Sequence, residues 1–234
     1  MERRRYVIVM AAGSGLRMGT SLSKQFLQIG CKAVLQHTIE TFLEASPGIS
    51  VVTVLNPDYV QYWREYCLKH NFTCPQIIVA GGITRFHSVR NALDKIPEGA
   101  IVAVHDGVRP LVTVPLVKEM FGKAEEIPAL IPVVPCVDTL KVLRKEGDEL
   151  RTIEGAVADR SVLYAAQTPQ VFHSELLKSA YALAYDTLFT DDASVVQKYG
   201  KSLSYIMGER LNIKITTQED LLLAKAVMSL RDND

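Results

Sequence analysis

The chain has 234 residues, of which 48% are hydrophobic, and this length and composition suit one α/β domain with a single large core. Its 26 Lys and Arg residues balance 26 Asp and Glu residues, so the surface lacks the basic field that a nucleic-acid-binding protein needs. Any anion site must therefore be local, and we expect one domain over residues 1–234 with no nucleic-acid partner.

Short, continuously apolar runs recur along the chain and predict strands that are buried on both faces. These runs cover residues 6–10, 51–55, 77–80, 101–104 and 129–134. Segments of helical length, with polar residues at roughly helical spacing, lie between them over residues 34–44, 59–70, 85–95 and 114–126. The alternation predicts a mostly parallel sheet with helices on both faces.

This alternation breaks at about residues 136–159. Residues 139–144 and 150–153 flank the charged turn Gly147-Asp148, which predicts a protruding β-hairpin. The charged turn and small apolar content suit the core poorly, so we expect an arm that packs on a second subunit of a homodimer. Beyond it we expect helices over 174–185 and 193–199, a strand over 203–207, and a final helix opened by Thr217-Gln-Glu-Asp220.

The cysteines and the amino terminus indicate a cytoplasmic protein without a membrane partner. Cys31, Cys67, Cys74 and Cys136 show no CxxC spacing and no cysteine–histidine ligand spacing, so neither a disulfide framework nor a structural zinc site is predicted. The apolar stretch behind the basic start covers only residues 6–12, which is too short for a signal peptide or a membrane span.

The first predicted strand runs into a glycine-rich loop with two basic residues. The loop reads Ala11-Ala-Gly-Ser-Gly-Leu-Arg-Met-Gly19, and Lys24 follows it. Small residues let backbone N–H groups approach phosphate oxygens, while Arg17 and Lys24 supply positive charge. The loop is neither a Walker A motif nor GxGxxG, because the residues after Gly15 fit neither spacing. A tight connection alone would explain the glycines, but the two cations favour an anion site.

This loop, with Ser23-Lys-Gln-Phe26, resembles the signature loop of sugar-phosphate nucleotidyltransferases. Further motifs follow in the order found in methylerythritol-phosphate cytidylyltransferases, so that the resemblance spans residues 6–220. These motifs are Gly81-Gly-Ile-Thr-Arg-Phe-His-Ser-Val89, His105-Asp-Gly-Val-Arg-Pro110, Asp138-Thr-Leu-Lys141, Thr168-Pro-Gln170, Thr190-Asp-Asp-Ala-Ser194 and Asn212-Ile-Lys-Ile-Thr216.

The resemblance implies a fold and an activity. The fold is a single Rossmann-like nucleotidyltransferase domain with a mostly parallel sheet and a hairpin arm for dimerisation. The activity is transfer of a cytidylyl group from CTP to a sugar-alcohol phosphate, 2-C-methyl-D-erythritol 4-phosphate, in the non-mevalonate isoprenoid pathway. The reaction uses Mg²⁺ and gives 4-diphosphocytidyl-2-C-methyl-D-erythritol and pyrophosphate.

The resemblance also implies roles for individual residues. Arg17 and Lys24 lie along the triphosphate and Lys214 near the α-phosphate, as the catalytic cations. CTP binding falls to Ala11, Ala12, Gly13, Gly15, Gly82, Arg85, Ser88 and Asp106. Acceptor binding falls to Asp106, Arg109, Thr139, Arg160, Thr168, Thr190 and Lys214, and Arg160 reaches across a dimer interface. Ile83 and Thr84 stand where many relatives carry acidic residues, so the resemblance assigns their side chains no role.

The position of Asp106 in the fold can be predicted from the sequence without the resemblance. It comes after the apolar run 101–104, and ligand sites of open parallel sheets lie at the carboxyl ends of strands. A carboxylate there can hold Mg²⁺ or an acceptor hydroxyl, and it can also pair with Arg109. We expect neighbouring His105 to be a structural group, because the histidines show no zinc-site spacing.

Two alternatives stay open on the sequence. A D-ribitol 5-phosphate cytidylyltransferase shares the glycine loop, the HD-x-x-RP and TPQ motifs and a similar carboxy-terminal lysine motif. Ala11-Ala12, Lys141 and the 190–194 motif favour methylerythritol phosphate. The other alternative is a non-catalytic nucleotide-binding protein, against which the joint presence of Asp106 and the catalytic cations argues.

Overall fold

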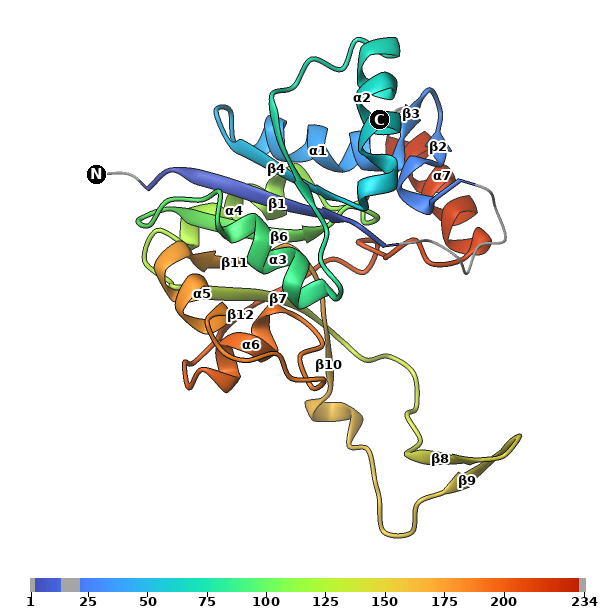
Figure 1. Ribbon diagram of the computed structural model, residues 1–234. Helices are drawn as coiled ribbons and strands as arrows, with labels where there is room; N and C mark the ends of the chain where they lie inside the picture. The colour runs from blue at the N-terminus through green and yellow to red at the C-terminus, as the bar shows by residue number, and fades with distance from the viewer. Residues whose placement is uncertain (1–2, 14–21, 232–234) are drawn as a thin grey trace.

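The computed structural model of the chain describes residues 3–13 and 22–231, and a large sheet with helices on both faces forms its body (Figure 1). The strands of this sheet are β1 (Arg5–Ala11), β4 (Ser50–Leu55), β5 (Gln76–Ala80), β6 (Ile101–Asp106), β7 (Ala129–Pro135), β10 (Tyr164–Ala166), β11 (Gln170–His173) and β12 (Ser204–Met207). Their order is β10-β7-β11-β6-β1-β4-β5, and β12 also pairs with β7. Two small ribbons pair β2 (Gln28–Ile29) with β3 (Lys32–Ala33), and β8 (Leu143–Glu146) with β9 (Glu149–Thr152).

Four of the five apolar runs form the parallel half of the sheet, as predicted, and the fifth forms β7 on the other side of β11. β1 is parallel to both β4 and β6, and Tyr6 lies opposite Ser50 on one side and Val102 on the other. β4 is in turn parallel to β5. These strands are rich in branched aliphatic residues, which pack well on a sheet that is covered on both faces.

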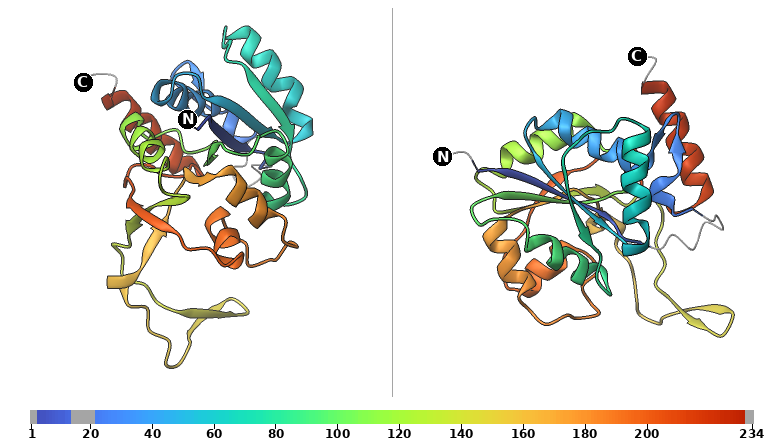
Figure 2. Two further views of the ribbon diagram at one scale, coloured as in Figure 1. Left: turned by 90° about the vertical axis from the view of Figure 1, so that its left-hand side faces the viewer. Right: turned by 45° about the horizontal axis from the view of Figure 1, so that its top comes forward.

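Helices cover both faces of the sheet (Figure 2). They are α1 (Val34–Ala45), α2 (Val60–Lys69), α3 (Arg85–Leu93), α4 (Val114–Lys123), α5 (Ser174–Tyr181) and α6 (Asp192–Lys198), whereas the last helix, α7 (Gln218–Arg231), packs next to β2. Alternate side chains of β1 enter two apolar clusters: Val7 and Val9 pack with α1, α2 and α4, whereas Tyr6 and Ile8 pack with α3, α5 and α6. This period of two buries both faces of the strand.

Antiparallel strands at one side of the sheet were not predicted. β11 lies between β6 and β7 and is antiparallel to both, and β10 is antiparallel to the end of β7. β11 has only four residues and begins with Gln170, so its pattern does not stand out in the sequence. The sheet is therefore mixed, with the parallel strands β6, β1, β4 and β5 on one side and the antiparallel pairings of β11 and β10 on the other.

The predicted hairpin is present and projects from the body of the molecule (Figures 1 and 2). β8 and β9 are antiparallel, with Leu143 opposite Thr152 and Glu146 opposite Glu149, so Gly147 and Asp148 form the turn. Gly147 has φ 63°, a left-handed conformation that glycine adopts without strain. The paired strands begin at residue 143 and not at 139. All of their residues are exposed, so the hairpin contributes nothing to the core of its own chain.

The last helix, α7, lies next to β2 and β3 (Figure 1). Leu221, Ala224 and Val227 of α7 form a third apolar cluster with Val108 and Ile215, among others. The cysteines are free thiols. Within residues 3–13 and 22–231, no helix combines the length and the apolar character needed to cross a bilayer.

Candidate active site

A cavity of about 400 Å³ lies at the carboxyl ends of β1 and β6, where open parallel sheets place their ligands. It brings together side chains from four of the motifs singled out in the sequence. Its described lining residues are Met10, Ala11, Ala12, Gly13, Lys24, Gln25, Gly82, Ile83, Thr84, Arg85, Ser88, Asp106, Val108 and Lys214. Most of the predicted CTP-binding residues and two of the predicted catalytic cations therefore share one cavity. Gly15 and Arg17 lie outside the described residues.

Asp106 is the electrostatic centre of this cavity. Its Oδ2 lies 3.0 Å from Lys214 Nζ and 3.2 Å from Arg109 Nε. Burial alone would raise the pKa of this carboxyl, but the charges of Lys214, Arg85 and Arg109 outweigh burial and hold the pKa well below its usual value. Asp106 is therefore ionised at neutral pH. The sequence left open a structural pair with Arg109, and the structure contains that pair.

The segment that carries Lys214 is fixed on both sides of the lysine. The N–H of Ile215 donates to the carbonyl of Val108 at 2.9 Å, and Ile215 itself is fully buried. On the other side, Arg109 Nη1 donates to the carbonyl of Asn212 at 2.8 Å. The Lys214 side chain is 42% exposed and ends beside Asp106. Packing around the backbone, and not around the ammonium group, thus sets the position of Lys214.

A chain of hydrogen bonds supports Asp106 from behind. The Asp106 N–H donates to Thr168 Oγ1 at 3.1 Å, and that hydroxyl is 3.1 Å from His105 Nδ1. His105 Nε2 lies 3.2 Å from the carbonyl of Arg109. All three bonds are satisfied if His105 is neutral with its proton on Nε2. Thr168 therefore lies in the wall behind Asp106, and its direct contact with the acceptor stays a prediction.

We expect His105 to make the fold less stable as the pH falls from 6.5 towards 4. Burial lowers the pKa of His105 from 6.5 to about 4, against the raising effect of the Asp106 carboxylate. In this window the unfolded chain takes up a proton at His105 that the folded chain does not, so the free energy of unfolding decreases by roughly 3 kcal/mol.

Denaturant unfolding of the wild type and of His105→Gln at pH 7 and pH 4.5 measures this effect. Glutamine keeps a side-chain donor but does not titrate. The variant should therefore lose less of its unfolding free energy between the two pH values than the wild type. An equal loss in both proteins would contradict the assignment.

The segment after β5 is shaped by two glycines. A Cβ on Gly81 would lie 2.5 Å from Ala12 Cβ, and one on Gly82 would lie 2.5 Å from His87 Cβ. Glycine is thus required at 81 for the segment to approach Ala12 after β1, and at 82 for it to approach α3. The Gly82 N–H donates to Ser88 Oγ at 2.9 Å, and Ser88 Oγ donates to the carbonyl of Thr84 at 2.9 Å. These bonds give Ser88 a role in holding the loop that lines the cavity.

Gln25 is a site residue that the sequence did not predict. Its side chain is almost fully buried, and Nε2 donates to the carbonyls of Ala11 at 2.9 Å and Gly13 at 3.4 Å. It therefore holds the start of the glycine loop against the short 3₁₀ helix Lys24–Phe26. Its position directly after Lys24 in the Ser23-Lys-Gln-Phe26 motif was the available signal.

Five of the seven predicted acceptor-binding residues do not line this cavity: Arg109 and Thr168 contact Asp106 from outside it, and Thr139, Arg160 and Thr190 lie elsewhere. Thr139 and Arg160 are exposed at the two ends of the arm, and Arg160 Nη1 donates to the carbonyl of Val137 at 2.9 Å. Thr190 lines a different cavity, of about 720 Å³, between the base of the arm and α6. A single chain thus gathers Asp106 and Lys214, with Arg109 and Thr168 beside them, but leaves Thr139, Arg160 and Thr190 apart.

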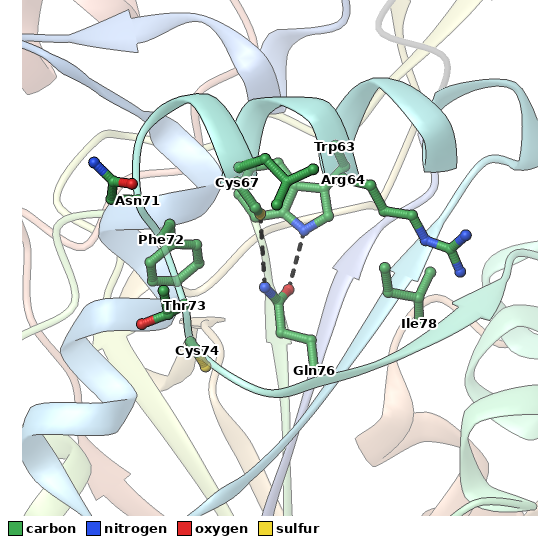
Figure 3. A pocket seen from close by; sticks show the side chains of 10 residues that line it. Trp63, Arg64, Cys67, Asn71, Phe72, Thr73, Cys74, Gln76 and Ile78 are labelled. Atoms are coloured by element: carbon green, nitrogen blue, oxygen red, sulfur yellow. Dashed lines mark hydrogen bonds between the residues drawn. The ribbon is translucent and has the colours of Figure 1, made fainter.

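A further cavity, of about 410 Å³, lies between α2 and β5 (Figure 3). Its described lining includes none of the predicted site residues. Gln76 occupies its floor, where Oε1 accepts from Trp63 Nε1 at 3.0 Å and from Thr53 Oγ1 at 2.7 Å. Arg64 is its one charged lining residue among the described ones, so it lacks the convergent charge of the Asp106 cavity.

The sequence of this chain is similar to known proteins over nearly its whole length. The model of the family 2-C-methyl-D-erythritol 4-phosphate cytidylyltransferase matches residues 6–230. A protein of that name from Bacteroides thetaiotaomicron is 42% identical over 222 residues, which cover 95% of this chain and 98% of the relative. One from Porphyromonas gingivalis strain W83 is 42% identical over 231 residues, covering 98% of this chain and 100% of the relative.

Solved structures agree with this match. The crystal structure of 4-diphosphocytidyl-2C-methyl-D-erythritol synthase from Anaerococcus prevotii superposes with a TM-score of 0.79 at 27% identity, covering 97% of each chain. That of 2-C-methyl-D-erythritol 4-phosphate cytidylyltransferase from Thermus thermophilus has a TM-score of 0.73 at 30% identity, covering 97% of this chain and 99% of the other. All described lining residues of the Asp106 cavity fall within the range that the family model matches.

Proposed function

This chain belongs to the 2-C-methyl-D-erythritol 4-phosphate cytidylyltransferase family, and we propose that the Asp106 cavity is where it transfers a cytidylyl group from CTP to 2-C-methyl-D-erythritol 4-phosphate. The enzyme is a nucleotidyltransferase of isoprenoid biosynthesis, and its products are 4-diphosphocytidyl-2-C-methyl-D-erythritol and pyrophosphate. The observation that carries the proposal is the pair of Lys214 and Asp106, 3.0 Å apart, in one cavity with the glycine loop. Release of pyrophosphate from CTP in the presence of the acceptor tests it.

The charges of the cavity suit two anionic substrates. CTP brings about four negative charges and the acceptor phosphate about two at neutral pH. Lys24, Arg85 and Lys214 line the cavity, and Arg109 lies next to it. We assign Lys24 to the triphosphate, as the resemblance implies, together with Arg17, which lies outside the described residues. Lys214 is assigned to the α-phosphate.

The reaction needs positioning more than proton transfer. An oxygen of the acceptor phosphate attacks the α-phosphorus of CTP and forms a new P–O bond. The bond between the α-phosphorus and the oxygen that bridges it to the β-phosphorus breaks, and pyrophosphate leaves with that oxygen. A phosphate monoester with a second pKa of about 6 is mostly a dianion at pH 7, so no general base is required. The ammonium group of Lys214 stabilises the charge that builds on the α-phosphate oxygens in the transition state.

The carboxylate of Asp106 fits a Mg²⁺ site that is completed by substrate. No cluster of three or more His, Cys, Asp or Glu side chains occurs in the described part of the chain that would hold a metal by itself. Asp106 is ionised and faces the cavity, and Mg²⁺ in nucleotide enzymes commonly takes one or two carboxylates and completes its coordination with phosphates and water. Bound there, Mg²⁺ would neutralise phosphate charge, and Asp106 would hold it.

The relatives favour methylerythritol phosphate over ribitol phosphate as the acceptor. The curated relatives at 40–42% identity that cover 95% or more of the chain carry the methylerythritol name. A non-catalytic nucleotide-binding protein is disfavoured by the same match and by the convergence of Lys24, Asp106 and Lys214 in the cavity.

We further propose that the active enzyme is a homodimer whose arm completes the partner's acceptor site. Thr139 in the arm and Arg160 directly after it are exposed and outside the Asp106 cavity of their own chain. The arm also exposes apolar side chains that its own chain does not cover, among them Val137, Leu150 and Val157. A guanidinium group suits a phosphate dianion because its donors match two phosphate oxygens at once.

Mixing two impaired variants tests this arrangement. Arg160→Ala and Lys24→Ala chains should each be weakly active alone, whereas a mixed dimer regains one composite site with both groups intact. We therefore expect partial recovery of CTP turnover after the two proteins are mixed and allowed to exchange subunits. Absence of recovery in a mixture that has demonstrably exchanged would mean that Arg160 acts in its own chain.

A further inference from the structure

A buried ion pair joins two motifs that lie far apart in the sequence. Arg85 Nη1 donates to Asp192 Oδ1 at 2.9 Å, and Nη2 donates to Oδ2 at 2.6 Å, so the two groups meet fork to fork. Tyr181 OH also donates to Asp192 Oδ1, at 2.5 Å. Asp192 is completely buried, whereas the Arg85 side chain keeps 30% of its surface exposed. The carboxylate is therefore satisfied from inside the protein, and the guanidinium group still reaches the surface.

The surface that Arg85 reaches is the wall of the Asp106 cavity. Arg85 is the first residue of α3, and the loop before it is held by Ser88 and by Thr84, whose Oγ1 accepts from the N–H of His87 at 3.4 Å. Those bonds fix the backbone but not the long side chain. The paired bonds from Asp192 fix the plane and the direction of the guanidinium group.

Asp192 is itself held firmly from the other side. Its neighbour Asp191 caps α6, where Oδ1 accepts from the N–H of Ser194 at 2.8 Å, and Oδ2 accepts from Gln170 Nε2 at 2.8 Å. Gln170 Oε1 accepts from the N–H of Ala193 at 2.8 Å. Gln170 belongs to β11, so the start of α6 is tied to the central sheet. The segment 190–194 thus presents Asp192 to Arg85 from a rigid support.

We propose that Asp192 is a positioning residue for CTP, which orients the guanidinium group of Arg85 in the cavity. The inference rests on the cytidylyl transfer proposed above and adds a residue that contacts no substrate itself. An Arg85 freed from this pair would sample several rotamers, so CTP would have to order it on binding. Loss of Asp192 should therefore weaken CTP binding more than it weakens binding of the acceptor.

Asp192→Asn is the central test, because asparagine keeps the shape of the side chain and removes its charge. We expect KM for CTP to rise about 10-fold or more, since a hydrogen bond to a charged group is lost, while KM for the acceptor changes far less. Glu125→Gln is the matched control. It breaks an ion pair with Arg5, 3.1 Å long, at the opposite end of β1, and should leave both KM values unchanged.

The double variant Arg85→Gln with Asp192→Asn separates positioning from folding. It leaves no charge unpaired, so its melting temperature should exceed that of Asp192→Asn, while its KM for CTP stays raised. Unchanged KM for CTP in folded Asp192→Asn, or full recovery of KM together with stability in the double variant, would overturn the proposal. Calorimetric titration of the same proteins with CTP and Mg²⁺ ranks their affinities for CTP without any turnover. A wild-type protein that binds CTP but gives no product would therefore count against the proposed reaction and not against the role of Asp192.

Discussion

Lys214→Ala is expected to lower kcat by a factor of about 10² or more while the fold remains intact. The ammonium group lies 3.0 Å from Asp106 and faces the cavity, so its loss removes positive charge from the place where the α-phosphate develops negative charge. The backbone around it is held by Ile215 and Asn212, which the substitution does not touch. Lys24→Ala should have an effect of similar size, because Lys24 lines the same cavity.

The measurement is kcat together with the melting temperature of each variant. Lys118→Ala, which changes an exposed lysine on α4, is the matched control and should keep wild-type turnover. A loss of melting temperature in proportion to the loss of activity would mean that Lys214 supports the fold and not the reaction. Wild-type turnover in Lys214→Ala would exclude the mechanism proposed here.

D-Ribitol 5-phosphate is expected to be a poor acceptor, with kcat/KM at least about 10²-fold below that of 2-C-methyl-D-erythritol 4-phosphate. Methylerythritol phosphate carries a methyl branch and a four-carbon chain, whereas ribitol phosphate has an additional carbon with a hydroxyl group. A misplaced methylene alone changes discrimination by about 10- to 200-fold, and a buried polar group without a partner costs more. Both effects act against ribitol phosphate in a site built for the shorter substrate.

Initial rates with each acceptor, at identical CTP and Mg²⁺ concentrations, measure this ratio. Equal or better turnover of ribitol phosphate would reassign the acceptor while leaving the cytidylyl transfer itself in place. Thr190 is the residue to vary next in that case, because the resemblance assigns it to the acceptor and the structure places it in a separate cavity.

The sequence predicts those strands in which apolar residues fill nearly the whole element. β1, β4 and β6 are nearly uninterrupted apolar runs, and both of their faces are buried. β11 was missed because its first residue is a glutamine. Gln170 is 1% exposed only because Asp191 and the N–H of Ala193 satisfy its amide, and neither partner is near it in sequence.

The same distinction holds for the site. The motifs predicted that Asp106 and Lys214 have chemical roles, and the topology then brings them within 3.0 Å of each other. Asp192 lies in the 190–194 motif, but the sequence assigns it no role, because a sequence does not distinguish a buried carboxylate with an arginine partner from an acid on the surface. The direction of the Thr168 hydroxyl, towards His105 and Asp106, likewise depends on contacts between distant segments.

The central claim is the transfer of a cytidylyl group from CTP to 2-C-methyl-D-erythritol 4-phosphate in the Asp106 cavity. The most direct measurement is phosphorus NMR of the purified protein with CTP, Mg²⁺ and this acceptor, with Lys214→Ala run in parallel. The wild type should give a new diphosphate ester and one pyrophosphate for each CTP consumed, and the variant should give almost none in the same time. An unchanged CTP spectrum with the folded wild-type enzyme, or equal product from the variant, would contradict the account.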